Sequence, residues 1–260
     1  MNTESVKKLR EKTSKSEVAK FQAISWFNTV AKSLDCYSPD QLEKLIQPEN
    51  IKKDLDGKNV TTRAWRKYRD GTRLPSDGFK SNGMAGPVIA AGKRSLDSLT
   101  IYRHPIWNIM RNEKFDFADT VKLLDYFDPF VRRYYIDLES KDQDEIFESF
   151  VQNVGLSIWI DRDDDMIRSL DHLSIHLMML RMDNFYHSRS ALEGIAENIV
   201  RTLGPISVSP WTASIHEEMF NWLEKHIWKG IFNTHYIEGS DSIKGWQRTR
   251  GQWILPNYRL

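Results

Sequence analysis

The chain has 260 residues, of which 40% are hydrophobic and 28% are charged, and its formal net charge is only +1. This length and composition predict an ordered globular protein of one large or two small domains and exclude a disordered chain. Because Cys36 is the one cysteine, no disulfide can form within the chain, and we expect a reducing, cytoplasmic location. No apolar run approaches the roughly 20 residues of a membrane-spanning helix, so we expect no membrane as a partner.

The charges are distributed unevenly along the chain. Residues 51–114 contain 14 Lys and Arg against 6 Asp and Glu, whereas residues 115–200 contain 8 against 18. A basic region attracts phosphate and an acidic one repels it, so this asymmetry suggests a basic nucleic-acid module joined to an acidic body. The alternative is that the two oppositely charged halves attract each other. We expect a basic helical domain at residues 1–112 and an acidic helical domain at 113–260, the latter ending in a basic, aromatic tail.

The first two elements are expected to be helices. Residues 4–34 carry a broad apolar stripe at helical spacing. A second helix is expected to begin after Ser38, because serine suits the N-cap and Pro39 suits the first helical position. Pro48 is expected to end this second helix.

The next segments combine short helices and turns. A short helix is expected at about 49–55, ended by the turn signal Asp56-Gly57. The glycine-rich segment after Pro75 is expected to be a loop. A helix is then expected over 87–99, followed by a turn or a new helix start at Pro105.

The acidic half also shows helical patterns, and the predicted fold class is therefore mainly α. A long helix is expected over 161–190, where leucines recur at helical spacing. Further helices are expected at about 191–203 and 209–232. The run "LSIWI" at 156–160 is compatible with a short isolated strand.

The segment 61–76, "TTRAWRKYRDGTRLPS", concentrates five basic residues in one short helix and turn. Either of its first two threonines can cap the helix. Trp65 and Tyr68 share one face, while the basic side chains lie largely on the other. Gly71 suits the left-handed position after a helix, and Pro75 prevents its continuation. These features predict a helix at about 61–70 with a buried aromatic face and a cationic outer face.

The spacing of Tyr68, Gly71 and Pro75 resembles the end of the recognition helix in helix-turn-helix proteins of the lambda-repressor/Cro type. In that family an aromatic residue is followed three positions later by glycine and seven positions later by proline. Residues 51–59 would then supply the first helix and the turn, so that the resemblance covers about 51–76. It implies a helix-turn-helix-like N-terminal module packed on, or linked to, a larger helical C-terminal body.

The resemblance implies that the N-terminal half of the helix at 61–70 enters the major groove of DNA. The side chains assigned to base edges or nearby phosphates are Thr62, Arg63 and Arg66. The side chains assigned to phosphates are Lys67, Arg69 and Arg73. The partner is then nucleic acid, with DNA favoured over RNA or another polyanion, and the C-terminal body serves oligomerisation or a protein partner. The alternative is a helix whose cations only solvate the surface.

A stripe of polar side chains is expected on the helix at 161–190. His172, His176, Met179, Asp183 and His187 fall within about 80° of arc on one helix. Two histidines four residues apart can hold one metal ion from adjacent turns. The stripe lacks the glutamate of the zinc-protease motif, however, and Met179 interrupts it. We therefore expect a polar flank beside the leucine face, with no metal and no cofactor.

Arg181 and His187 carry a second resemblance. Arginine, five intervening residues and histidine on a helix resemble the motif of the HEPN class of helical ribonucleases. The resemblance implies that arginine stabilises the phosphate while histidine acts in acid–base cleavage without a metal ion. The preferred prediction is a regulatory DNA-binding protein that is not an enzyme. The alternatives are this RNA-cleaving effector and a non-enzymatic scaffold for protein interactions.

Overall fold

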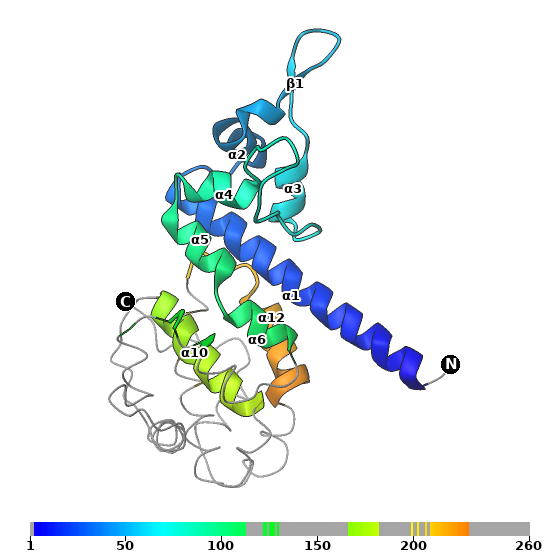
Figure 1. Ribbon diagram of the computed structural model, residues 1–260, viewed down its shortest axis with the longest axis vertical. Coiled ribbons are helices and arrows are strands. Elements are labelled where there is room, and N and C mark those ends of the chain that lie inside the picture. Colours follow the sequence, from blue (N-terminus) through cyan, green and yellow to red (C-terminus); the bar gives the residue numbers. More distant parts are fainter. Residues whose placement is uncertain are drawn as a thin grey trace. The chain divides into compact units, whose positions relative to one another are not determined.

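The computed structural model describes residues 3–112, 166–181 and 209–228, together with 122–123, 125–127, 129, 199, 202 and 206 (Figure 1). The described part is 62% helix and 4% strand, which confirms the prediction of a mainly α protein for these residues. None of the helices in this part is both long enough and apolar enough to cross a membrane.

The chain forms two compact units. The first comprises Met1–Trp107 and the later segment Pro210–Ile215, and the second comprises Asn108–Ser209 and His216–Leu260. The elements of the first unit are α1 (Thr3–Ser33), α2 (Pro39–Ile46), the 3-10 turn η1 (Pro48–Asn50), β1 (Lys52–Lys53), β2 (Asn59–Val60), α3 (Ala64–Arg69), α4 (Pro87–Gly92) and α5 (Leu96–Arg103). The remaining described elements are α6 (Ile106–Arg111), which continues into the second unit, α10 (Met166–Arg181), α12 (His216–Leu223) and the π-helical turn η2 (Glu224–Trp228).

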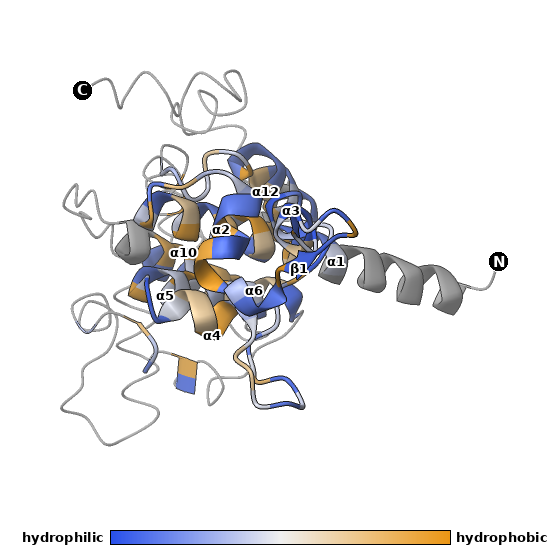
Figure 2. Cartoon of the chain, turned by 90° about the horizontal axis from the view of Figure 1, so that it is seen from above, coloured by the Kyte–Doolittle hydropathy of each residue, from blue (hydrophilic) through white to orange (hydrophobic). Residues whose placement is uncertain are grey.

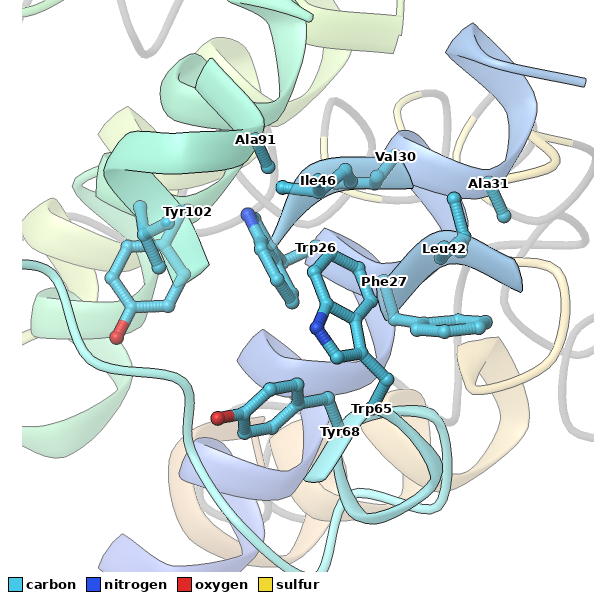
Figure 3. Packing of buried hydrophobic residues seen from close by; sticks show 11 residues of the cluster. Trp26, Phe27, Val30, Ala31, Leu42, Ile46, Trp65, Tyr68, Ala91 and Tyr102 are labelled. Carbon is cyan, nitrogen blue, oxygen red and sulfur yellow. The ribbon is translucent and has the colours of Figure 1, made fainter. Parts of the chain in front are cut away.

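The core of the first unit is built on α1, which packs against α3 and α5. Trp26 of α1 is fully buried, and its ring centroid lies 5.3 Å from that of Trp65 and 5.7 Å from that of Tyr68 on α3 (Figure 3). Tyr102 of α5 lies on another side of Trp26, at 6.3 Å between centroids. Trp26 meets Tyr68 and Tyr102 edge to face, and aromatic pairs each contribute about 0.5–1.5 kcal/mol beyond the burial of their surface. The aromatic cluster therefore joins three helices that are distant in sequence.

The predicted boundaries of the first two helices are confirmed within one or two residues. Helix α1 ends at Ser33, and α2 begins at Pro39 with Ser38 as its N-cap. The Ser38 hydroxyl accepts a hydrogen bond from the Gln41 N–H at 3.4 Å. The N-cap preference of serine was therefore sufficient to predict where α2 begins.

Residues 51–59 differ from the sequence-based expectation. Lys52–Lys53 pairs antiparallel with Asn59–Val60, so the segment is a β-hairpin. The Asp54 carboxylate accepts the N–H groups of Asp56 and Lys58, at 3.0 and 2.8 Å, and so closes the turn between the strands. The predicted helix at 49–55 is therefore wrong beyond the single turn η1, and so is a first helix-turn-helix helix at 51–59. The preceding helices that pack against α3 are α1 and α2.

The segment after Pro75 is a loop, as predicted, and it is held in place. Arg103 of α5 donates two hydrogen bonds to the Asp77 carboxylate, at 2.7 and 2.8 Å. The Tyr102 hydroxyl donates to the Pro75 carbonyl. The helix predicted over 87–99 is two helices, α4 and α5, because Ser95 breaks the run and caps α5 by accepting the Ser98 N–H at 3.3 Å.

Helix α10 lies within the long helix predicted over 161–190, whose other residues lie outside the described part. Every residue from Leu170 to Leu180 is buried, so α10 has no solvated face along this stretch. Helix α12 begins later than the helix predicted from residue 209, because residues 210–215 form turns. The strand expected at 156–160, most of the helix expected at 191–203 and the C-terminal tail are outside the described residues.

Candidate nucleic-acid interface

The C-terminal stop of α3 has the geometry that its sequence predicts. Gly71 has a φ of 65°, in the left-handed region. The Thr72 N–H donates to the Lys67 carbonyl at 2.9 Å and the Gly71 N–H donates to the Tyr68 carbonyl at 3.1 Å. These two bonds form a Schellman motif, which satisfies carbonyls that have no partner within the helix.

Gly71 also brings the end of α3 against α1. A Cβ atom at this position would lie 2.5 Å from Cγ of Lys20 and 2.9 Å from Cδ1 of Ile24. We expect Gly71→Ala to lower the free energy of unfolding by about 1–3 kcal/mol, because it adds left-handed strain and a clash. Urea unfolding followed by tryptophan fluorescence measures this loss.

Gly78→Ala is the matched control for Gly71→Ala. Gly78 has an ordinary φ, and no atom lies within 4 Å of the position its Cβ would take. We expect its stability to stay within about 0.5 kcal/mol of the wild type. Equal stabilities of the two variants would contradict the close approach of α3 to α1.

The N-terminal start of α3 differs from the prediction. The helix begins at Ala64, and its N-cap is Arg63, which makes no side-chain capping bond and has a φ of 61°. The predicted cap at Thr61 or Thr62 is therefore wrong. The Thr62 hydroxyl accepts the Ala64 N–H at 3.3 Å, but it also donates to Glu43. This anchoring places a non-glycine residue, Arg63, in a conformation that costs about 1–2 kcal/mol.

Glu43 of α2 is a residue of this site that sequence reasoning missed. Its side chain is fully buried, and Oε1 accepts both the hydroxyl and the N–H of Thr62, the latter at 3.2 Å. Its spacing from Pro39 and Ile46 places Glu43 on the buried face of α2. A carboxylate on the apolar face of a predicted helix is the sequence signal that could have identified Glu43. Glu43 fixes the backbone that leads into α3.

Two of the predicted contact residues are paired with acids. The Arg66 guanidinium binds the Asp40 carboxylate, with Nε donating to Oδ1 at 3.1 Å. This hydrogen bond is the main cause of a lowered Asp40 pKa. Arg69 Nε donates to Asp70 at 2.8 Å. Both pairs are substantially exposed and therefore contribute little to stability.

Three predicted contact residues are exposed cations without a paired acid. Within the residues that the structure describes, Arg63, Lys67 and Arg73 form no ion pair. The aromatic side chains of α3 are buried, with Trp65 0% and Tyr68 4% exposed. In Figure 2 strand β1 carries hydrophilic colours. The predicted separation of an aromatic inner face from a cationic outer face is confirmed.

The polar stripe of the acidic half is buried where the structure describes it. His172 is 4% exposed, and His176 and Met179 are fully buried. No group of three or more His, Cys, Asp or Glu side chains in the described ranges could hold a metal ion. Asp183 lies outside those ranges.

For the ribonuclease alternative, the structure describes only one of the two residues. Arg181 Nη2 donates to the Met110 carbonyl at 3.2 Å, which supports a structural role for this guanidinium. His187 lies outside the described residues, so their pairing stays a prediction.

His176 should make the stability of the second unit sensitive to acid. Burial lowers its pKa to about 3, and its Nδ1–H donates to the His172 carbonyl. The unfolded chain binds a proton below about pH 6.5 that the folded protein does not, so stability falls as the pH drops from about 6.5 towards 3. At about pH 5 the expected loss is roughly 2 kcal/mol.

Urea unfolding at about pH 7 and pH 5 tests this dependence on His176. His176→Gln should flatten the pH dependence, whereas His216→Gln, at a half-buried position on α12, should keep it. An unchanged pH dependence in His176→Gln would show that another group causes it.

No protein-family model matches this chain, and no curated protein and no solved structure matches it.

Proposed function

We propose that this protein binds duplex DNA through the outer face of α3 and acts as a cytoplasmic regulator. Residues 113–260 would then serve oligomerisation or a protein partner. The proposal is supported by the surface at α3. The aromatic residues of the helix are buried, whereas Lys67 on the helix, Arg63 before it and Arg73 in the turn after it are exposed with no acid paired to them among the described residues.

The charge around α3 supports an anionic partner. Residues 52–73 contain eight Lys and Arg against three Asp. Asp70 pairs with Arg69 and Asp40 of α2 pairs with Arg66, and the cations remain in excess when both acids are counted. The field outside α3 is therefore positive, and such a field attracts the closely spaced phosphates of a duplex.

The attachment of α3 supports a contact with a defined orientation. Helix α3 is fixed against α1 by two contacts, the aromatic cluster around Trp26 and the close approach of Gly71. The backbone that leads into α3 is fixed by the hydrogen bond that the Thr62 N–H donates to the Glu43 carboxylate. A cationic face on a rigid element keeps its side chains in register with phosphates, which flexible cations on a loop do not do.

Salt-dependent binding to a short random-sequence DNA duplex tests the proposal. Fluorescence anisotropy should give a slope of log K against log salt of about −2.7 or steeper, since each phosphate contact contributes about −0.9 and three cations are available. An RNA duplex and heparin serve as comparison ligands. Absence of binding at low salt would overturn the proposal, and tighter binding to RNA than to DNA would assign the surface to RNA.

Arg63→Gly separates binding from folding. Glycine adopts the left-handed φ of this position without strain, so we expect the free energy of unfolding to stay within about 1 kcal/mol of the wild type or to rise. We expect affinity for the duplex to fall roughly eightfold at about 0.1 M salt, the effect of one lost phosphate contact. Unchanged affinity would remove Arg63 from the interface.

A further inference from the structure

The β1–β2 hairpin is a two-stranded ribbon without a core of its own. Every residue from Lys52 to Val60 is exposed. Figure 1 shows the hairpin projecting from the helices of the first unit. A ribbon that buries neither face is marginally stable in water, because it gains little from the hydrophobic effect. Contacts at its turn and at its base must hold it.

Both ends of the hairpin are fixed by hydrogen bonds. At the turn, the Asp54 N–H donates to the Lys58 carbonyl at 2.9 Å, and Gly57 has a φ of 75°. At the base, the Thr61 hydroxyl donates to Asp40 of α2 at 3.0 Å. Because residues 61–63 connect the hairpin directly to α3, α2 positions both elements.

The hairpin carries cations on both faces and an apolar residue at its tip. Successive side chains of a strand point to opposite faces, so Lys52 and Lys53 extend from the two sides of the ribbon. Lys58 adds a third cation before β2. Leu55, in the turn, is fully exposed at 107%. A groove of duplex DNA presents a phosphate strand on each side and sugars and base edges at its floor, which matches this arrangement.

We propose that the hairpin of residues 52–60 is a second contact with duplex DNA and that its tip enters the minor groove beside the site of α3. This inference rests on the proposed function of α3. The minor groove is about 6 Å wide and admits a narrow tip, and apolar side chains are known to insert there. Leu55 contacts the groove floor, and Lys52 and Lys53 contact phosphates of the two strands. Asp56, also at the tip, opposes binding.

Lys52→Ala/Lys53→Ala tests the phosphate contacts. With the short DNA duplex, we expect the salt slope to fall in magnitude by about 1.8 and the affinity to fall roughly 60-fold at about 0.1 M salt. The matched control, Lys93→Ala/Arg94→Ala, removes the same charge from two exposed residues after α4, and we expect a change of no more than about twofold. Equal effects of the two double variants would overturn the inference.

Leu55→Ala and Asp56→Asn test the tip. Leu55→Ala should weaken binding roughly tenfold without changing the salt slope, and Asp56→Asn should strengthen it. Netropsin, bound beforehand in the minor groove of an A·T-rich duplex, should weaken binding of the wild type more than binding of the Leu55→Ala variant. If the wild type binds the duplex and netropsin has no effect, the groove assignment is wrong while the function proposed for α3 stands. If the wild type binds no duplex, both proposals are wrong.

Discussion

Trp65→Ala is expected to lower the free energy of unfolding of the first unit by about 3–5 kcal/mol. The Trp65 side chain is fully buried, and it contacts Trp26, Phe27 and Tyr68 at centroid distances between 5.3 and 6.4 Å. Its removal leaves a cavity between α1 and α3 and also leaves Gln47 without the indole N–H that it accepts at 3.4 Å. Because whole domains are stable by only about 5–15 kcal/mol, this loss is a large fraction of the total.

Urea unfolding followed by circular dichroism measures the effect of Trp65→Ala. Tyr37→Ala is the matched control, since Tyr37 is an aromatic residue 65% exposed in the same unit, and its loss should change stability by less than about 0.5 kcal/mol. Trp65→Phe should have an intermediate effect. A loss below about 1 kcal/mol in Trp65→Ala would contradict the central position of this side chain.

Lys67→Ala/Arg73→Ala is expected to weaken duplex binding roughly 60-fold at about 0.1 M salt, because it removes two phosphate contacts of about eightfold each. Both residues are exposed, and within the described residues neither has an acid partner. We therefore expect the free energy of unfolding to change by less than about 0.5 kcal/mol. Anisotropy titrations over a range of salt concentrations give both the affinity and the slope.

Lys93→Ala/Arg94→Ala is again the control, because it changes the net charge of the same unit by the same amount. Similar losses in both double variants would show that binding responds only to total charge. A specific loss in Lys67→Ala/Arg73→Ala would locate the contact on α3 and the turn that follows it.

The parts of the fold that the sequence predicted are those set by local chemistry. The cap at Ser38 and the stop at Gly71 each depend on residues within a few positions. The burial of Trp65 and Tyr68 followed from helical spacing alone. The sequence alone therefore predicts which residues of α3 lie on its buried face and which lie on its exposed face.

The hairpin was missed because its turn signal is ambiguous. Asp56-Gly57 suits both the end of a helix and a hairpin turn, and the flanking residues of 51–60 show no clear strand alternation. The choice depends on Asp54, whose carboxylate binds two N–H groups within the turn. Pairing of the strands then follows from this turn.

The side-chain pairings around α3 depend on the packing of α2 against α3. Asp40 pairs with Arg66 across 26 positions of sequence, and Glu43 binds Thr62 across 19. Neither pairing follows from local sequence, because each requires the approach of two helices. The left-handed conformation of Arg63 is a consequence of the same approach, since the residue before it is anchored on α2.

Arginine side-chain NMR reports whether duplex DNA contacts the outer face of α3. We expect the Nε–Hε signals of Arg63 and Arg73 to shift as a short duplex is added, because their guanidinium groups are exposed and form no ion pair among the described residues. The signal of Arg103, which is bound to Asp77, should stay in place. Shifts confined to signals outside residues 52–73, or no shifts at low salt, would show that duplex DNA does not contact the outer face of α3.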